Sequence, residues 1–337
     1  MKPLPAICLL ALSALPLHAG LFTFSAVNVT ALTVDGIAQQ ASFAGPTTIS
    51  ISRTGERTLF DPINMMSPVG TASATSTASA RAGAGTLGVQ TAVTIHGAGA
   101  PTSLNASAGK YANPGAGQLF DANGAQADFS SSDLRITPIP GAGVSGAGML
   151  SARLNLNLDG TFTTNPVLAG PGTASMSSTL YLSIRFGYVD PVTHAQGMPS
   201  FYAGNVTLTQ SFGGAPMFGA GTGLLAGYVG GPLAISTAAT DLPIGVPISL
   251  DVRLAAITEV SAQGTADYSG GVDFFHTLSL PTAGDVLTLP AGYSTQSTEL
   301  NVAGNSFTAV PEPAGWAGLA ATGLLGFALA RRWTLRA

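Results

Sequence analysis

The stretch from Leu150 to Thr164, LSARLNLNLDGTFTT, carries the clearest structural signal of the chain. Apolar and polar residues alternate from Leu150 to Leu158, and Asp159-Gly160 separates this run from a second extended stretch. Successive side chains of a β-strand point to opposite faces, so the alternation predicts a strand with one buried and one solvated face. An Asp-Gly pair between two such runs is typical of a tight turn. The stretch therefore predicts antiparallel β-structure.

The same period of two recurs along the middle of the chain, in residues 87–95, 180–188, 206–212 and 248–260. No segment between Phe22 and Val310 has sustained helical spacing. Two antiparallel sheets packed through their apolar faces are the simplest solution. We therefore expect an all-β domain over residues 20–310, an antiparallel β-sandwich or jelly-roll-like fold. Whether it forms one domain or two stays open, with a possible boundary near residues 100–145.

Two segments have low sequence complexity. Residues 71–85, TASATSTASARAGAG, fit either a flexible linker or a pleated strand of small side chains. Residues 213–231 are rich in glycine and predict a mobile loop.

The N-terminal 19 residues have the layout of a secretory signal peptide. Lys2 gives a basic start, residues 4–15 are apolar, and cleavage is expected between Ala19 and Gly20. An uncleaved anchor is the alternative, although the run is shorter than a typical span. Cys8 is the only cysteine and would leave with this peptide, so the exported chain would have no disulfide.

Charged residues make up 8% of the chain, and its net charge is −4. Because an acidic exported domain lacks the basic surface that nucleic acids require, we expect no nucleic-acid partner. Many Gly, Ala, Ser and Thr residues with few charges are typical of an extracellular β protein.

The motifs associated with catalysis or cofactors are incomplete. Gly141, Gly143 and Gly146 match a dinucleotide-loop pattern, but an alternating strand follows where a helix should begin. Ser145 lacks the final glycine of a nucleophile elbow. The histidines at 96, 194 and 276 have no ligand-type neighbours at metal-binding spacing, and His276 fits a core or rim position beside Phe274. We therefore expect no enzymatic activity and no cofactor.

Two binding functions stay open. Asp121, Asn123 and Asp128 offer oxygen ligands for calcium, but the EF-hand spacing is absent, and a solvated turn is the alternative. A carbohydrate site would use exposed aromatic rings, yet Trp316 and Trp333 both belong to the tail. A carbohydrate-binding module is therefore the second reading of function, and an uncharacterised extracellular hydrolase is the third.

The C-terminal region, residues 311–337, reads as a membrane segment. Residues 314–330 are uncharged and would rise roughly 26 Å as one transmembrane helix. Basic residues that follow this helix would stay in the cytoplasm and stop translocation, with the domain outside: Arg331, Arg332 and Arg336. Small residues recur at every fourth position of the helix and would allow close packing of another membrane helix: Ala314, Gly318, Thr322, Gly326 and Ala330.

Pro311-Glu312-Pro313 lies immediately before this helix, and its prolines predict a short extended segment that a membrane protease could bind. The triplet, the short span and the terminal arginines together resemble the PEP-CTERM sorting domain of Gram-negative exported proteins. The stretch from Asp273 to Ser297, with its Leu289-Pro-Ala-Gly292 turn, is similar to the last strands before this signal in many such proteins, although His276 replaces their usual Asn.

The resemblance implies that exosortase, a membrane enzyme, recognises the triplet and processes the protein. It also implies a precursor anchored in the inner membrane with its N-terminal side out, and a product at the cell surface or in the exopolysaccharide matrix. We therefore expect a structural or adhesive exported protein with exosortase as partner, and exopolysaccharide as a further candidate partner.

Overall fold

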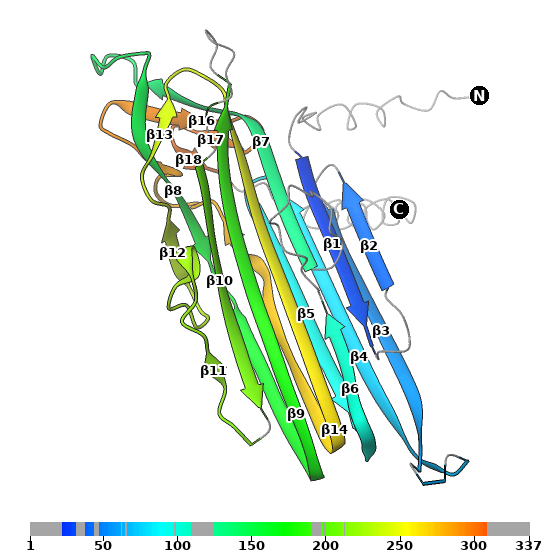
Figure 1. Ribbon diagram of the computed structural model, residues 1–337. Helices are drawn as coiled ribbons and strands as arrows, with labels where there is room; N and C mark the ends of the chain where they lie inside the picture. Colours follow the sequence, from blue (N-terminus) through cyan, green and yellow to red (C-terminus); the bar gives the residue numbers. More distant parts are fainter. Residues whose placement is uncertain are drawn as a thin grey trace, which may run out of the picture.

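The computed structural model shows an elongated all-β protein (Figure 1). It describes residues 22–31, 38–43, 47–61, 63–64, 66–97, 99–108, 125–189, 197, 200–211 and 213–308. All ladders between strands in this part of the chain are antiparallel. The prediction of an all-β, antiparallel domain is confirmed.

The first strands are β1 (Phe22–Thr30), β2 (Ala38–Phe43), β3 (Thr47–Phe60), β4 (Pro68–Gly83), β5 (Thr86–His96), β6 (Ala100–Ala108), β7 (Ala125–Pro138), β8 (Met149–Leu158) and β9 (Thr161–Tyr188). The later ones are β10 (Ser200–Ser211), β11 (Met217–Phe218), β12 (Leu233–Ser236), β13 (Thr240–Pro243), β14 (Ile248–Ser279), β15 (Leu287–Thr288), β16 (Tyr293–Gln296), β17 (Val302–Ala303) and β18 (Ser306–Phe307). One 3-10 turn, η1 (Gly223–Leu225), follows β11.

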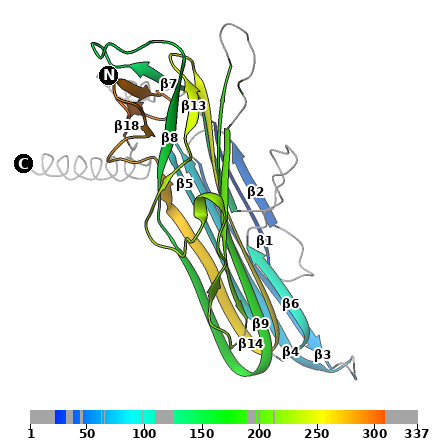
Figure 2. The ribbon, with the colours of Figure 1, turned by 60° about the vertical axis from the view of Figure 1, so that its left-hand side comes forward.

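A long ribbon made of β9 and β14 organises the fold. The two strands pair from Ile248 opposite Tyr188 to Asp273 opposite Thr161, with a register shift just after Gly264. β6 and β7 pair with the first half of β14, whereas β5 pairs with its second half. Gly264 has a φ of +77°, a conformation that glycine adopts without strain. The ribbon therefore bends near Gly264 and runs through two layers, and Figure 2 shows this fold-over at the lower end of both strands.

The first layer contains β10, β9, β14, β6, β7, β1 and β2, and the second contains the other halves of β9 and β14 with β5, β4 and β3. Because β9 and β14 belong to both layers, 16 strands of the described residues form one continuous network of pairings. This arrangement is consistent with a sandwich whose apolar faces meet between the layers.

Small side chains fill part of that core. In β4, alternate residues are buried from Ala72 to Ala82, and most are alanines. The segment 71–85 is therefore largely a pleated strand, and the reading as a flexible linker is wrong. Small inward side chains let two sheets approach closely, and here they leave room for hydroxyl contacts across the layers. Thr91 of β5 and Ser178 of β9 both hydrogen-bond to Thr258 of β14, at 2.8 and 3.0 Å, so these buried hydroxyls are satisfied.

The run from Leu150 to Leu158 forms β8 with its alternate residues buried, as its pattern predicts. The Asp159-Gly160 pair does not close a hairpin, however, because β8 pairs with β12, β13 and β15 rather than with β9. Gly160 has no positive φ. A Cβ atom there would lie 2.4 Å from Cδ1 of Phe274, so close packing is what requires this glycine.

The glycine-rich segment 213–231 is held in place rather than mobile. It contains β11 and η1, and Leu225 is fully buried. Backbone hydrogen bonds tie it to β10, from Gly219 N to Thr207 O and from Thr222 N to Asn205 O, both 2.8 Å. Glycines here allow close backbone approach, since a Cβ at Gly223 would lie 1.8 Å from the carbonyl oxygen of Ala203.

Candidate functional site

Several residues singled out from the sequence lie outside the described part of the chain: the signal peptide with Ala19 and Gly20, the whole tail 309–337, His194, and two of the three calcium candidates, Asp121 and Asn123. The side chain of His276 also lies outside it. Among the residues that the structure describes, no helix has the length and apolar character needed to cross a bilayer. The sorting residues therefore stay sequence predictions.

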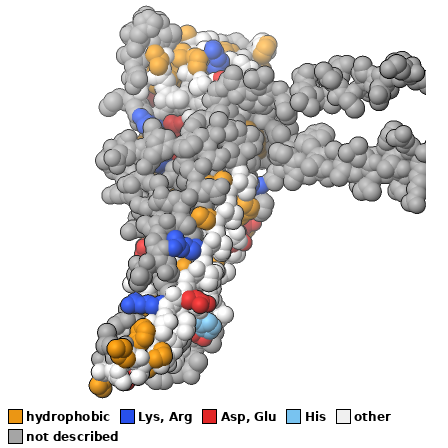
Figure 3. All heavy atoms as spheres, turned by 90° about the vertical axis from the view of Figure 1, so that its right-hand side faces the viewer, with side chains coloured by type: hydrophobic (Ala, Val, Ile, Leu, Met, Phe, Trp, Pro, Cys, Tyr) orange, Lys and Arg blue, Asp and Glu red, His pale blue; other side chains and the backbone are white. Residues whose placement is uncertain are grey.

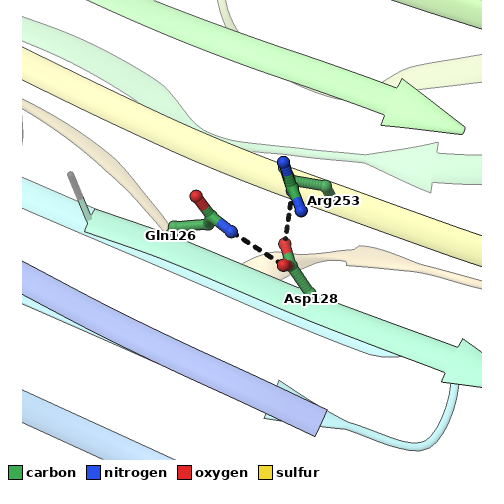
Figure 4. Close-up of polar contacts among 3 residues, drawn as sticks. All are labelled: Gln126, Asp128 and Arg253. Atoms are coloured by element: carbon green, nitrogen blue, oxygen red, sulfur yellow. Dashed lines mark hydrogen bonds and ion pairs between the residues drawn. The ribbon is translucent and has the colours of Figure 1, made fainter. Parts of the chain in front are cut away.

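The third calcium candidate, Asp128, forms a polar cluster with Gln126 and Arg253 (Figure 4). Arg253 of β14 lies directly opposite Asp128 of β7 in the register. Its Nε donates to Asp128 Oδ1 at 3.1 Å, while Gln126 Nε2 donates to Asp128 Oδ2 at 2.7 Å. The register of two strands 125 residues apart in sequence thus brings the pair together.

The Asp128 carboxylate is poorly solvated, with 14% of its side chain exposed. Burial raises its pKa from 3.8 to about 6, although Arg253 and Gln126 oppose this rise. Both carboxylate oxygens already accept hydrogen bonds, one of them from a cation. Since a guanidinium group competes with a metal ion for the same oxygen, the geometry at Asp128 favours an ion pair over a calcium ligand. In the described residues, no group of three acidic, His or Cys side chains is placed to hold a metal.

The cluster belongs to a polar strip on the face of the first layer that points away from the core. Inward neighbours such as Phe129 and Leu254 are fully buried, so the alternate residues point outward. The register places Ser183 of β9 next to Arg253, and the next outward-facing position of β9 is Tyr181, opposite Ala255. Burial raises the pKa of the Tyr181 hydroxyl, although a hydrogen bond with Thr179 opposes this rise. Tyr181 and Ser183 are both half-buried on this face.

The outer face of the second layer is an array of hydroxyl groups, which we call the hydroxyl face. It consists of Ser50, Ser52, Thr54 and Thr58 on β3, Ser73, Thr75, Thr77 and Ser79 on β4, and Thr94 on β5. Thr54 and Thr75 hydrogen-bond to each other at 3.2 Å, and Ser79 donates to Ser50 at 2.8 Å. In Figure 3 a white band runs upward from the lower tip of the molecule, with blue, red and pale-blue side chains beside it.

Neighbouring strands of a sheet lie about 4.8 Å apart, and residues on one face repeat roughly every 6.7 Å along a strand, so these hydroxyls form a regular lattice. Two charged residues share this face: Glu56 of β3, which is exposed and opposite Ser73, and Arg81 of β4, which is opposite Thr48. At one end His96 Nδ1 contacts Asp267 on β14. The hydroxyl face therefore presents many neutral hydrogen-bonding groups, with one exposed carboxylate, that of Glu56, among them.

The glycine motif and the serine motif considered in the sequence analysis both lie in a loop. Gly141 and Gly143 have φ values of +83° and +68° in the connection between β7 and β8, where the backbone turns. Ser145 is exposed, and its hydroxyl donates to the carbonyl oxygen of Ala147 at 2.8 Å. No histidine or carboxylate contact to Ser145 accompanies this turn in the described residues.

A second polar cluster, which the sequence reading missed, joins β7 to the C-terminal strands. Asp133 Oδ2 accepts hydrogen bonds from the backbone N–H groups of Thr298 and Glu299 at 2.8 and 3.1 Å. Its other oxygen accepts hydrogen bonds from Ser131 and Ser297. Glu299 in turn accepts from the backbone N–H of Ser132 at 2.7 Å. We call this reciprocal arrangement the C-terminal clasp.

Beyond the clasp, a two-residue hairpin completes the described chain. β17 and β18 are joined by Gly304 and Asn305, whose φ values of +60° and +68° are those of a type I′ turn. The Asn305 side chain accepts from Leu287 N at 2.9 Å and donates to Leu287 O at 2.7 Å, so it acts as a strand partner for β15. A Gly-Asn pair is a recognised hairpin signal, so this turn could have been read from the sequence.

Comparisons with known proteins add little. No protein-family profile matches the chain, and no curated relative matches it. Solved structures with weak similarity include the infectious bursal disease virus Gx strain structure, at 13% identity and a TM-score of 0.08, covering 93% of this chain and 75% of the other. They also include particles of a mutant VP2 protein of that virus (13%, 0.08, 89% and 69%) and its VP2 subviral particle (11%, 0.07, 90% and 74%). TM-scores this low carry no argument about fold or function.

Proposed function

We propose that this chain is an exported protein of the cell surface or exopolysaccharide matrix, sorted through its C-terminal tail and without a catalytic role. The observation that carries the proposal is the order of elements in residues 311–337: the Pro311-Glu312-Pro313 triplet, an uncharged stretch of helix length, and an arginine cluster. In this proposal exosortase recognises the triplet while the helix is held in the inner membrane, and the processed domain is then released to the surface.

The end of the folded domain is compatible with processing at this place. The C-terminal clasp and the β17–β18 hairpin fix the chain up to Thr308, whose N–H donates to Asn301 O at 3.0 Å. Pro311 follows three positions later, a reach of roughly 10 Å. The folded domain would therefore sit close to the membrane until the tail is processed.

The surface chemistry supports a matrix role. Apart from Glu56, the hydroxyl face offers a repeating, uncharged set of donors and acceptors, which suits contact with a neutral hydrated polymer that also repeats. The two carboxylates that meet in the clasp, Asp133 and Glu299, hold backbone N–H groups, and this gives them a structural role.

Replacement of Glu312 by alanine tests the sorting step. We expect Glu312→Ala to leave full-length protein in the inner membrane, because the motif that the protease recognises is lost. Glu259→Ala, which removes an exposed glutamate from β14, is the control and should be released like the wild type. Fractionation and immunoblotting distinguish these outcomes, and intact mass measurement of the released product should place its new C-terminus near the triplet. Normal release of Glu312→Ala would refute the proposal.

A carbohydrate-binding module is the second candidate, favoured by the polar strip with its half-buried Tyr181. The two functions differ in how the protein associates with glycans. A matrix component fractionates with exopolysaccharide without saturable affinity for a defined oligosaccharide. Saturable binding of one oligosaccharide in a calorimetric titration would favour the binding module instead.

A further inference from the structure

The connection between β3 and β4 carries the most exposed large apolar side chains of the described residues. Ile63 is 95% exposed and Met66 is 90% exposed, and Val69 and Phe60 beside them are 54% and 43% exposed. We call the described residues of this connection, 60–61, 63–64 and 66–69, the apolar tip. In Figure 3 it forms the orange cluster at the lower end of the molecule. Exposed apolar groups gathered in one place mark an interaction site more often than scattered ones do.

Hydrogen bonds hold this tip in shape. Asp61 Oδ1 accepts from Ile63 N at 2.8 Å, and Asn64 Nδ2 donates to Ser67 Oγ at 3.0 Å. Asp61 N also donates to Ser67 O at 3.0 Å, which closes the base of the connection. The turn therefore keeps Ile63 and Met66 directed into solvent, although this leaves apolar surface exposed. Such pre-organisation reduces the entropy that must be lost when a partner covers these side chains.

The chemistry of the tip points to the kind of partner. Its sequence, FDPINMMSPV, contains no Lys or Arg, and its one charged side chain, Asp61, is engaged in the turn. The tip is a convex end of the elongated molecule, formed where β3 and β4 project beyond the other strands (Figure 1). A convex apolar surface needs a complementary groove in a protein partner, whereas a lipid leaflet admits it without one. Loops with aliphatic and aromatic side chains enter the boundary between headgroups and acyl chains by burying apolar area.

We propose that the apolar tip inserts into a lipid bilayer, as a lipid contact separate from the C-terminal tail. The two contacts lie at opposite ends of β4. Phe307, next to the exit of the tail, packs against Gly85 just after the end of β4, whereas the tip includes Pro68 at the start of β4. Sixteen residues of strand span roughly 50 Å. The tip would therefore contact a membrane at the end of the molecule that lies far from Thr308. Because the tip itself has no cation, its insertion relies on buried apolar area rather than on attraction to anionic lipid.

A site-specific probe tests this in the full chain, where the tail could bind lipid on its own. Cys8, the only cysteine, is changed to serine, and Met66→Cys is labelled with an environment-sensitive fluorophore. The protein is mixed with phosphatidylcholine vesicles that contain a lipid-attached spin-label quencher. We expect quenching at position 66. Met217→Cys, at a residue 66% exposed on β11, is the matched control and stays unquenched.

Adding Ile63→Ser to the labelled protein should weaken insertion of the tip by about tenfold or more, because one of its apolar side chains is lost. Including phosphatidylglycerol in the vesicles should leave the quenching unchanged. Absence of quenching at position 66, equal quenching at positions 66 and 217, or no effect of Ile63→Ser would overturn the proposal. Efficient disulfide crosslinking between two copies of the unlabelled Met66→Cys variant without lipid would overturn it too, because the occupant would then be a second copy of the chain.

Discussion

The buried carboxylate of Asp128 predicts an unusual pH dependence of stability. The pKa of this group is about 6 in the folded protein and 3.8 in the unfolded chain, so the folded state holds the proton more tightly. Its contribution to stability is therefore fully present below pH 3.8 and is lost as the pH rises through about 6. The difference between the two pKa values corresponds to about 3 kcal/mol, of which about 2 kcal/mol falls between pH 4 and 7.

Asp128→Asn provides the comparison, because asparagine has nearly the same shape but cannot ionise. We expect the free energy of unfolding of the wild type, relative to this variant, to fall by about 2 kcal/mol from pH 4 to pH 7. Urea unfolding followed by circular dichroism measures this, since urea leaves the ion pair unscreened. Tryptophan fluorescence would not serve, because Trp316 and Trp333 both lie in the tail.

Arg253→Met checks the physical cause. Removing the opposing cation should raise the pKa of Asp128 further and destabilise the protein at pH 7 by about 3–5 kcal/mol, because a buried charge is left unpaired. The reasoning would be refuted if wild type and Asp128→Asn had parallel stabilities from pH 4 to 7. A wild type that gained stability over the variant with rising pH would show that the ion pair outweighs burial.

Two further predictions concern packing and the clasp. Asp133→Ala should lower the free energy of unfolding by about 3–5 kcal/mol and speed hydrogen exchange at the N–H groups of Thr298 and Glu299, because these donors lose their acceptor. Replacement of the exposed Asp241 by alanine serves as the control. Unchanged hydrogen exchange at Thr298 and Glu299 in Asp133→Ala would contradict the clasp. Gly160→Ala should cost about 1–3 kcal/mol in thermal or urea unfolding, because its Cβ would lie 2.4 Å from Phe274 Cδ1. Gly146→Ala, whose nearest neighbour would be 3.9 Å away, should have no measurable effect, and equal costs for the two variants would contradict the packing argument.

The sequence predicted the strands better than their partners. Alternation identified the buried faces of the runs 150–158, 180–188 and 248–260, because side-chain direction along a strand is a local property. It misread Asp159-Gly160 as a hairpin turn, since a glycine required by close packing against Phe274 looks the same as one required by a turn. It did not decide whether segment 71–85 is a linker or a strand. The strand depends on close packing between the two layers, which a local stretch of small residues does not reveal.

Among the candidate site residues, the sequence analysis singled out Asp128 but assigned it the wrong partners. It placed Asp128 with Asp121 and Asn123, its neighbours in the chain, whereas the described partners are Gln126 two residues away and Arg253, 125 residues away. The residues of the clasp were missed entirely. Ser297 was assigned to the stretch that is similar to the last strands before the sorting signal, and Glu299 was not singled out. Nothing local connects either residue to Asp133, up to 166 residues earlier.

The sequence by itself determined the all-β class, the inward and outward faces of most strands, and the low charge of the domain, because these follow from composition and from the two-residue period of a strand. It also supplies the sorting prediction, which depends on a contiguous motif. Only the tertiary structure decided that β9 and β14 bend through both layers, that Arg253 meets Asp128, and that Asp133 holds the turn that follows β16. These contacts depend on the register between distant strands. Register is set by the packing of the whole core, and no short stretch of sequence contains it.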